Sequence, residues 1–135
     1  MPTLGHCLAI AALALAAGAA TAAGGSPAGD AKAGEAIYSR CLACHALAYD
    51  RTGPRHCGLF GRRAGSVRDF TYSDAMKRSR IVWNEKSLDR FLANPLTAVP
   101  GTAMGYAGVT DPKERADLIA YLKHADASPQ CRKRP

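Results

Sequence analysis

The sequence has few of the residues that usually build a hydrophobic core or a membrane span. Only 9 of its 135 residues are aromatic, although 27 are alanine. No apolar run free of charges and glycines reaches the roughly 18 residues of a membrane-spanning helix. Acidic residues are scarce too, with 11 Asp and Glu against 18 Lys and Arg, so the net charge is +7. The mixed, aperiodic composition excludes a disordered or collagen-like chain, and the length suits one domain.

The first 22 residues contain no Lys, Arg, Asp or Glu. Their apolar stretch from Cys7 to Ala20 runs into Ala20-Thr21-Ala22, the kind of small residues that a signal peptidase reads. We therefore predict a signal peptide over residues 1–22, cleaved near Ala22, with a membrane anchor as the alternative. Residues 23–29 are predicted to be a flexible leader, and residues 127–135 a basic C-terminal tail.

Removal of residues 1–22 leaves 113 residues with few core-forming side chains. Only 26 of the 113 are Leu, Ile, Val, Met or aromatic. A domain of this size buries a modest fraction of its surface, so the thin core indicates that a large apolar group completes it. The remaining cysteines can be oxidised in an exported protein; they are Cys41, Cys44, Cys57 and Cys131.

Helical periodicity and helix caps predict an all-α fold with long loops, and no stretch alternates in the manner of a strand. We expect a first helix over residues 30–46, a short helix over 72–79, a helix over 85–93 that Pro95 ends, and a last helix that starts at Asp111-Pro112. Residues 47–71 and 95–110 are predicted to be irregular. A loop of that length suits a small domain only where it wraps around something rigid, which again indicates a bound group.

The motif Cys41-Leu42-Ala43-Cys44-His45 places two thiols about one helical turn apart, with an imidazole beside them. This spacing is typical of covalent haem attachment, in which both thiols bond the haem and His45 ligates its iron. A redox dithiol and half of a zinc site are the alternatives. The first needs a βαβ context and the second another Cys or His pair at similar spacing, and the sequence contains neither.

Haem iron held by His45 has a second axial position. A methionine sulfur suits it in an electron carrier, because this soft, neutral ligand raises the reduction potential and blocks small molecules. Beyond residue 22 the only methionines are Met76 and Met104. Met76 lies in a predicted helix, whereas Met104 follows Pro100-Gly101 in an irregular segment that can bend toward the iron. We expect Met104 to be the ligand and Met76 to pack in the core.

These motifs, together with others in the same order, resemble the class I c-type cytochromes, the family of soluble mitochondrial cytochrome c and its bacterial periplasmic relatives. The resemblance runs from Gly34 to Lys123. It rests on Gly34 and Tyr38, Gly53-Pro54, Gly58 to Arg62, Phe70 to Ala75, Trp83, Asn94-Pro95, Pro100 to Met104, and Asp117 to Lys123. It implies a domain over residues 30–126, in which N- and C-terminal helices cross and short helices and long loops wrap around one haem c, bound covalently through Cys41 and Cys44.

The resemblance also implies roles for single residues. The Pro54 carbonyl would accept a hydrogen bond from His45 and so orient its ring, and Thr102 would order the loop of Met104. Buried haem propionate needs donors, because an uncompensated charge is costly to desolvate; these would be Arg62, Tyr72, Ser73 and Trp83. That Tyr72 and Trp83 only fill the core is the alternative.

Two positions depart from the family's pattern. Phe91 stands where many relatives have a tyrosine that reaches the methionine sulfur. His56 replaces a residue that is commonly apolar; we expect an exposed loop histidine here, with a titrating neighbour of the haem or a second imidazole ligand as the alternatives.

Cys57 and Cys131 lie outside the haem motif and are unusual for the family. Two remaining thiols in an exported protein predict a disulfide that ties the loop after the haem motif to the C-terminal tail. Free thiols and an intermolecular bond are the alternatives.

The function implied by the resemblance is that of a soluble, monomeric, periplasmic single-haem electron carrier that is not an enzyme. Residues 51–90 hold ten basic and four acidic residues, which favours docking on acidic faces of redox proteins such as a quinol–cytochrome c reductase, terminal oxidase, dehydrogenase or photosynthetic reaction centre. Nucleic acid is not an expected partner. The alternatives are a dedicated cytochrome subunit of a periplasmic dehydrogenase or oxidase, and a haem ligand sensor or peroxidase-like enzyme.

Overall fold

The computed structural model describes residue 1 and residues 28–132, and within them the fold is all-α. In chain order the elements are α1 (Ala31–Tyr38), the 3-10 turn η1 (Ser39–Cys41), α2 (Asp74–Arg78), α3 (Glu85–Ala93), α4 (Pro95–Ala98), α5 (Pro112–Asp126) and α6 (Pro129–Arg132). The only β-type pairing in this part of the chain is an isolated bridge between Arg63 and Val82. The predicted signal peptide, most of the predicted leader and residues 133–135 lie outside the described residues.

Side-chain caps start the helices where the sequence predicts them. The Asp30 carboxylate accepts from the backbone N–H groups at the start of α1, and Asp111 does the same for α5. At α3, Asn84 and Ser87 form a reciprocal capping box, and the predicted bounds of 85–93 are confirmed. Each cap satisfies backbone donors that a helix start leaves without a partner.

The structure corrects two sequence predictions about helices. The first helix stops at Tyr38 and η1 at Cys41, because the Cys44 carbonyl accepts from Gly53 N at 2.7 Å and the chain turns there. Residues 95–110 are not irregular throughout, because they begin with the short helix α4: Asn94 caps it, and Pro95 suits its first turn. Within the segment predicted to be a basic C-terminal tail, residues Pro129–Arg132 form the short helix α6, and its Cys131 is buried.

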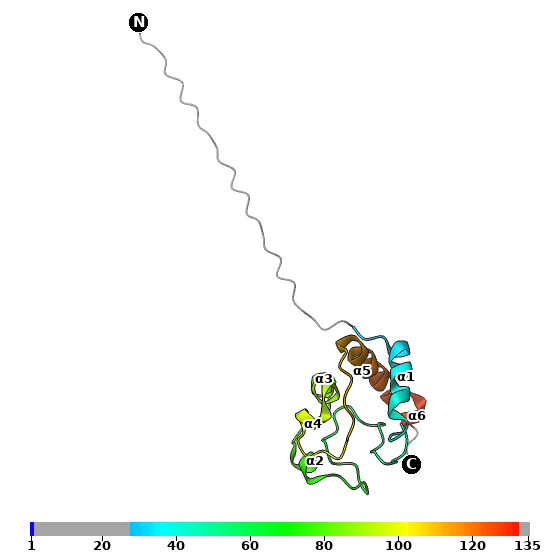
Figure 1. Cartoon of the computed structure of the whole chain (residues 1–135). Helices are drawn as coiled ribbons and strands as arrows, with labels where there is room; N and C mark the ends of the chain where they lie inside the picture. The colour runs from blue at the N-terminus through cyan, green and yellow to red at the C-terminus, as the bar shows by residue number, and fades with distance from the viewer. Residues whose placement is uncertain (2–27, 133–135) are drawn as a thin grey trace.

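The N-terminal helix packs directly across the C-terminal one, and Figure 1 shows α1 and α5 side by side. Gly34 makes this close approach: a Cβ there would lie 1.9 Å from the Asp117 carbonyl oxygen of α5. Gly29 is equally close, with a Cβ 2.0 Å from Ala116 O, so the end of the predicted leader is already packed against α5. The predicted crossing of the terminal helices is confirmed.

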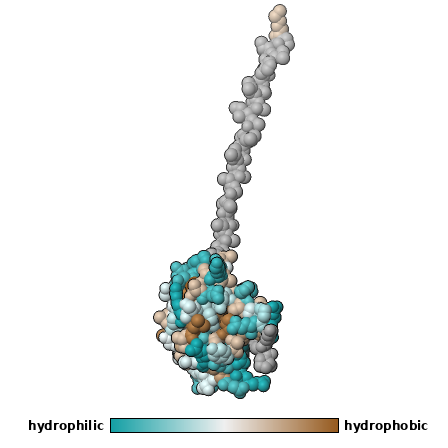
Figure 2. Space-filling model, turned by 90° about the vertical axis from the view of Figure 1, so that its right-hand side faces the viewer, coloured by the Kyte–Doolittle hydropathy of each residue, from teal (hydrophilic) through white to brown (hydrophobic). Residues whose placement is uncertain are grey.

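The core lies between this helix pair and the segments from α2 to α4. Leu118 of α5 is only 1 % exposed and Leu88 of α3 only 4 %. Among the residues described, no helix has the length and apolar character to cross a membrane. Figure 2 shows strongly hydrophobic residues near the centre of one face of the molecule, with hydrophilic residues around them.

Candidate functional site

A cavity of about 450 Å³ opens between α1, α3, α5 and the long loops. Cavities of this volume are typical of sites for small molecules and cofactors. Its wall brings together all ten residues that the sequence singles out for haem binding: Cys41, Cys44, His45, Pro54, Arg62, Tyr72, Ser73, Trp83, Thr102 and Met104.

The two thiols and the imidazole come from η1 and the turn after it. The backbone N–H groups of Cys44 and His45 both donate to the Cys41 carbonyl, at 3.1 and 2.9 Å, which holds the motif in one compact turn. Cys41 is half-buried and Cys44 exposed. Burial raises the pKa of the Cys41 thiol, although nearby Arg40 opposes this.

The His45 ring is buried and held on more than one side. Its Nδ1 lies 2.8 Å from the Pro54 carbonyl oxygen, so Nδ1 carries the proton and Nε2 is the nitrogen available to a metal. Burial lowers the pKa of His45, which favours the neutral imidazole that ligates metals. Gly53 packs against the ring: a Cβ there would lie 2.3 Å from His45 Cε1.

His56 is not the exposed loop histidine that the sequence favours. Its ring stacks on His45, with centroids 4.4 Å apart and planes 20° apart, and its Nδ1 lies 3.1 Å from the Tyr38 hydroxyl. Burial, with smaller effects of His45 and Arg62, lowers the pKa of His56 to about 3. The loop folds back so that His56 N donates to the Ala46 carbonyl, and this long-range turn is invisible to local patterns.

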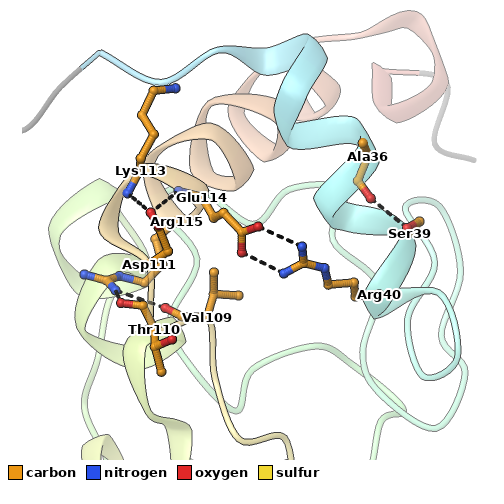
Figure 3. A network of polar contacts seen from close by, with 9 residues as sticks. All are labelled: Ala36, Ser39, Arg40, Val109, Thr110, Asp111, Lys113, Glu114 and Arg115. Atoms are coloured by element: carbon orange, nitrogen blue, oxygen red, sulfur yellow. Dashed lines mark hydrogen bonds and ion pairs between the residues drawn. The ribbon is translucent and has the colours of Figure 1, made fainter.

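The loop that carries Met104 is ordered from both ends. Thr102 Oγ1 accepts from Met104 N at 3.2 Å, and Thr102 N donates to the Val99 carbonyl at 2.9 Å. Beyond Met104, the Arg115 guanidinium donates to the carbonyl oxygens of Val109 and Thr110, at 3.0 and 2.9 Å, as Figure 3 shows. Sequence analysis missed Arg115. A basic residue within a predicted helix is common, and nothing in the local pattern indicates that this one binds the preceding loop.

Met76 and Met104 both touch the cavity but sit differently. Met76 is 8 % exposed and belongs to the hydrophobic core, whereas Met104 is partly buried and packs against that core from the loop between Thr102 and Gly105. Phe91 and Trp83 form part of the wall beside them, with ring centroids 5.1 Å apart. The assignment of Met104 as the iron ligand stays a prediction.

The polar side chains predicted to face a propionate also line the cavity. Arg62 donates to the carbonyl oxygens of Cys57 and Arg55, at 3.1 and 2.8 Å, and burial lowers the pKa of its guanidinium. Ser73 Oγ accepts from Met76 N as the cap of α2, which leaves its O–H able to donate elsewhere. Burial raises the pKa of Tyr72, so its hydroxyl keeps its proton and stays a donor.

The loop after the haem motif is attached to the C-terminal end of the fold. The sulfur atoms of Cys57 and Cys131 lie at bonding distance, with Cα atoms 5.0 Å apart, and both residues are buried. Beside them Gly58 N donates to the carboxylate of Asp126, the last residue of α5. The sequence predicted the cysteine pairing, whereas nothing in its local pattern singled out Asp126.

Arg40, next to Cys41, forms a bidentate ion pair with Glu114 in the first turn of α5. The two nitrogen–oxygen distances are 2.7 and 2.8 Å, and Figure 3 shows the pair bridging the two segments. The pair raises the pKa of Arg40 and lowers the pKa of Glu114. It attaches the chain just before the thiols to the C-terminal helix.

This donor set fits a covalently attached haem. It combines two thiols, an imidazole with Nε2 available, a thioether and polar donors around a largely apolar wall. Within residues 28–132, no three His, Cys, Asp or Glu side chains are grouped as ligands of a metal ion.

The comparisons with known proteins agree with this fit. The family model described as "Cytochrome c" matches residues 31–126. The chain is 42% identical over 94 residues to cytochrome c2 of Blastochloris viridis. The aligned region covers 67% of this chain and 74% of that protein. It is 55% identical over 86 residues to cytochrome c of Tetrahymena pyriformis, covering 63% and 78%. Among solved structures, cytochrome cH from Methylobacterium extorquens is similar, with a TM-score of 0.69 and 42% identity over 71% of this chain and 99% of that one.

Proposed function

The chain belongs to the cytochrome c family, whose members are electron carriers and not enzymes, and we propose that it is a soluble, periplasmic single-haem carrier between redox proteins. The observation that carries the proposal is the convergence of the thiol pair, His45 and Met104 on one largely apolar cavity. When bound, the haem supplies the one-electron ferric/ferrous couple.

The residues of this chain would hold the haem in the following way. Cys41 and Cys44 would attach it, and His45 Nε2 and the Met104 sulfur would be the ligands of its iron. The Pro54 carbonyl keeps the proton on His45 Nδ1, which increases the basicity of the ligand. Arg62, Tyr72, Ser73 and Trp83 donate to a propionate. Thr102 orders the backbone at Met104. With both residues as ligands, the iron would transfer electrons without binding a substrate.

The charge of the chain supports acidic redox partners. Residues 51–90 contain ten basic and four acidic residues, so a basic surface beside the haem would steer the encounter with acidic faces. A quinol–cytochrome c reductase, terminal oxidase, dehydrogenase or photosynthetic reaction centre has the expected chemistry. Cys57 and Cys131 lie at disulfide distance, and in this proposal they form a disulfide. A disulfide is stable in an exported protein, so this pair is consistent with export.

The visible spectrum of the ferric holoprotein tests the ligand set. Methionine-sulfur ligation of ferric haem gives a weak far-red charge-transfer band, which we expect in the wild-type protein. M104L should lose the band, and the matched variant M76L should keep it. The opposite result, or the absence of the band from the wild-type protein, would remove Met104 from the iron.

Carbon monoxide separates a carrier from a ligand-binding protein. With Met104 bound, the reduced holoprotein is expected to bind carbon monoxide slowly or not at all at neutral pH, whereas M104L should bind it promptly. Prompt binding by the wild-type protein would instead favour a haem ligand sensor or peroxidase-like enzyme.

A further inference from the structure

His56 contacts the proximal imidazole in a way that an ordinary packing residue does not. The Pro54 hydrogen bond holds one edge of the His45 ring, but a single bond at Nδ1 leaves the ring able to tilt about it. The His56 ring lies nearly parallel to His45, at a centroid distance of 4.4 Å. Stacking opposes tilting of either ring, because a tilt pushes one edge of the ring into its neighbour and pulls the other edge out of contact.

Gly53 adds backbone contact with the same ring. A Cβ at Gly53 would lie 2.3 Å from His45 Cε1 and 2.6 Å from both ring nitrogens. These distances describe a point above the flat face of the imidazole and not one at its edge. The His45 plane is therefore bounded by backbone as well as by the His56 ring.

His56 is itself held at several points. The Tyr38 hydroxyl lies 3.1 Å from its Nδ1, and Tyr38 is 3 % exposed in α1 and packs on Tyr121 of α5 with ring centroids 5.1 Å apart. The backbone on its C-terminal side is fixed by the Cys57–Cys131 pair and by the bond from Gly58 N to Asp126. The stacking partner of His45 is thus anchored to both terminal helices.

We propose that His56 is a positioning residue for the iron ligand, and that its ring, fixed by Tyr38, sets the plane of the His45 imidazole relative to the haem. This rests on the proposed function, because it assumes that His45 ligates the iron. An aliphatic side chain would fill the same space without fixing a plane, since it has no flat face and no ring nitrogen to form a hydrogen bond with Tyr38.

The proton NMR spectrum of the ferric holoprotein tests the proposal, because the shifts of the haem methyl groups depend on the orientation of the axial ligand planes. H56A removes the stacking ring and should rearrange the methyl shifts. H56F keeps a flat ring but has no nitrogen to bond Tyr38, so it should restore most of the wild-type pattern and leave a change no larger than that of Y38F. Y38F keeps the stack but loses the hydrogen bond, and should give a smaller shift in the same direction as H56A. H124A, at an exposed histidine in α5, is the matched control and should not change the pattern.

A methyl pattern in H56A that superimposes on that of the wild-type protein would overturn the proposal, as would equal changes in H56A and H56F. Y38F keeps the test decisive where H56A fails to fold, because an unchanged pattern in Y38F also contradicts the role of the Tyr38 bond. The far-red band separates this inference from the proposed function. Its absence from the wild-type protein contradicts His45–Met104 ligation, whereas its presence together with unchanged methyl shifts contradicts only the role of His56.

Discussion

Gly34 and Gly53 lie at positions where a missing side chain decides how close another group can come. At Gly34 the backbone of α5 occupies the space of a Cβ, and at Gly53 the His45 ring does. Both glycines belong to motifs of the family, but the sequence alone does not say what each one admits. The structure gives the physical reason: Gly34 allows two helices to cross, and Gly53 allows the His45 ring to be buried under backbone.

G34A is expected to destabilise the protein in spite of alanine's better helix propensity. Alanine would gain about 1 kcal/mol over glycine inside a free helix. Here its Cβ would lie 1.9 Å from Asp117 O, and relieving such overpacking costs typically about 1–3 kcal/mol or more. Urea unfolding of the holoprotein should show a lower midpoint. K32A, at an exposed site on the same helix, is the control and should change the midpoint little; an unchanged midpoint in G34A would mean that the helices separate at no cost.

Asp117 should make the stability of the protein depend on acid pH. Its side chain is 7 % exposed and accepts from Asp30 N at 2.6 Å and from Lys113 Nζ at 2.5 Å, and these contacts lower the pKa of Asp117. A carboxyl with a lowered pKa in the folded state stabilises that state above its unfolded pKa of about 3.9. The contribution is lost as pH falls through the folded pKa.

The free energy of unfolding, measured from about pH 6 to pH 2, should therefore fall less steeply in D117N than in the wild-type protein, and the two curves should converge in acid. D69N, at an exposed aspartate, is the control and should run parallel to the wild-type curve. Parallel curves for D117N would show that Asp117 does not couple folding to protons.

At the scale of elements, prediction from sequence succeeded where the signal is local. The capping box of Asn84 and Ser87 lies within four residues, and α3 has the predicted bounds. The first helix was overextended because the hydrogen bond that turns the chain joins Cys44 to Gly53. The C-terminal α6 was missed because its burial depends on Cys57, 74 residues earlier in the chain.

The haem motif was predicted for the same local reason, since its five residues are contiguous. The buried position of His56 was not predicted. It depends on a contact with Tyr38 of α1 and on the hydrogen bond from His56 N to the Ala46 carbonyl, ten residues earlier. Contacts between distant segments leave no period or cap in the sequence. That the ten predicted residues line one cavity was therefore predictable from the sequence, but the packing of His56 against His45 was not.

Removal of the Cys57–Cys131 bridge should lower the free energy of unfolding substantially. In the chain-entropy model, a link between residues 74 apart stabilises the folded state by roughly 4 kcal/mol. C57A/C131A should lose an amount of this order in urea unfolding, and the wild-type protein in reductant should lose a similar amount. A thiol assay on the unfolded, unreduced holoprotein is the companion measurement, in which two titratable thiols would contradict the bridge.

At the scale of the whole molecule, charge and cofactor change the meaning of the composition. The sparse apolar content belongs to a domain whose core contains a cavity of about 450 Å³ for the proposed haem. The formal charge of +7 falls to about +5 once two haem propionates are ionised. A positive molecule of this size attracts anions over distances that depend on salt, because the Debye length falls from about 30 Å at 0.01 M to about 8 Å at 0.15 M.

Electron exchange with small redox ions should therefore depend on salt in opposite directions for opposite charges. Oxidation of the reduced holoprotein by an anionic iron complex should slow by about tenfold as ionic strength rises from 0.01 to 0.15 M. Oxidation by a cationic cobalt complex should become faster over the same range.

Two variants test whether the basic segment, residues 51–90, steers these encounters. R78E and R132E change the charge equally at exposed arginines, one in α2 within the basic segment and one in α6. If the basic segment steers encounters at the haem, R78E should weaken the salt dependence for the anion more than R132E does. Equal effects would show that only the net charge matters, since a local field distinguishes the two sites and a uniform one does not.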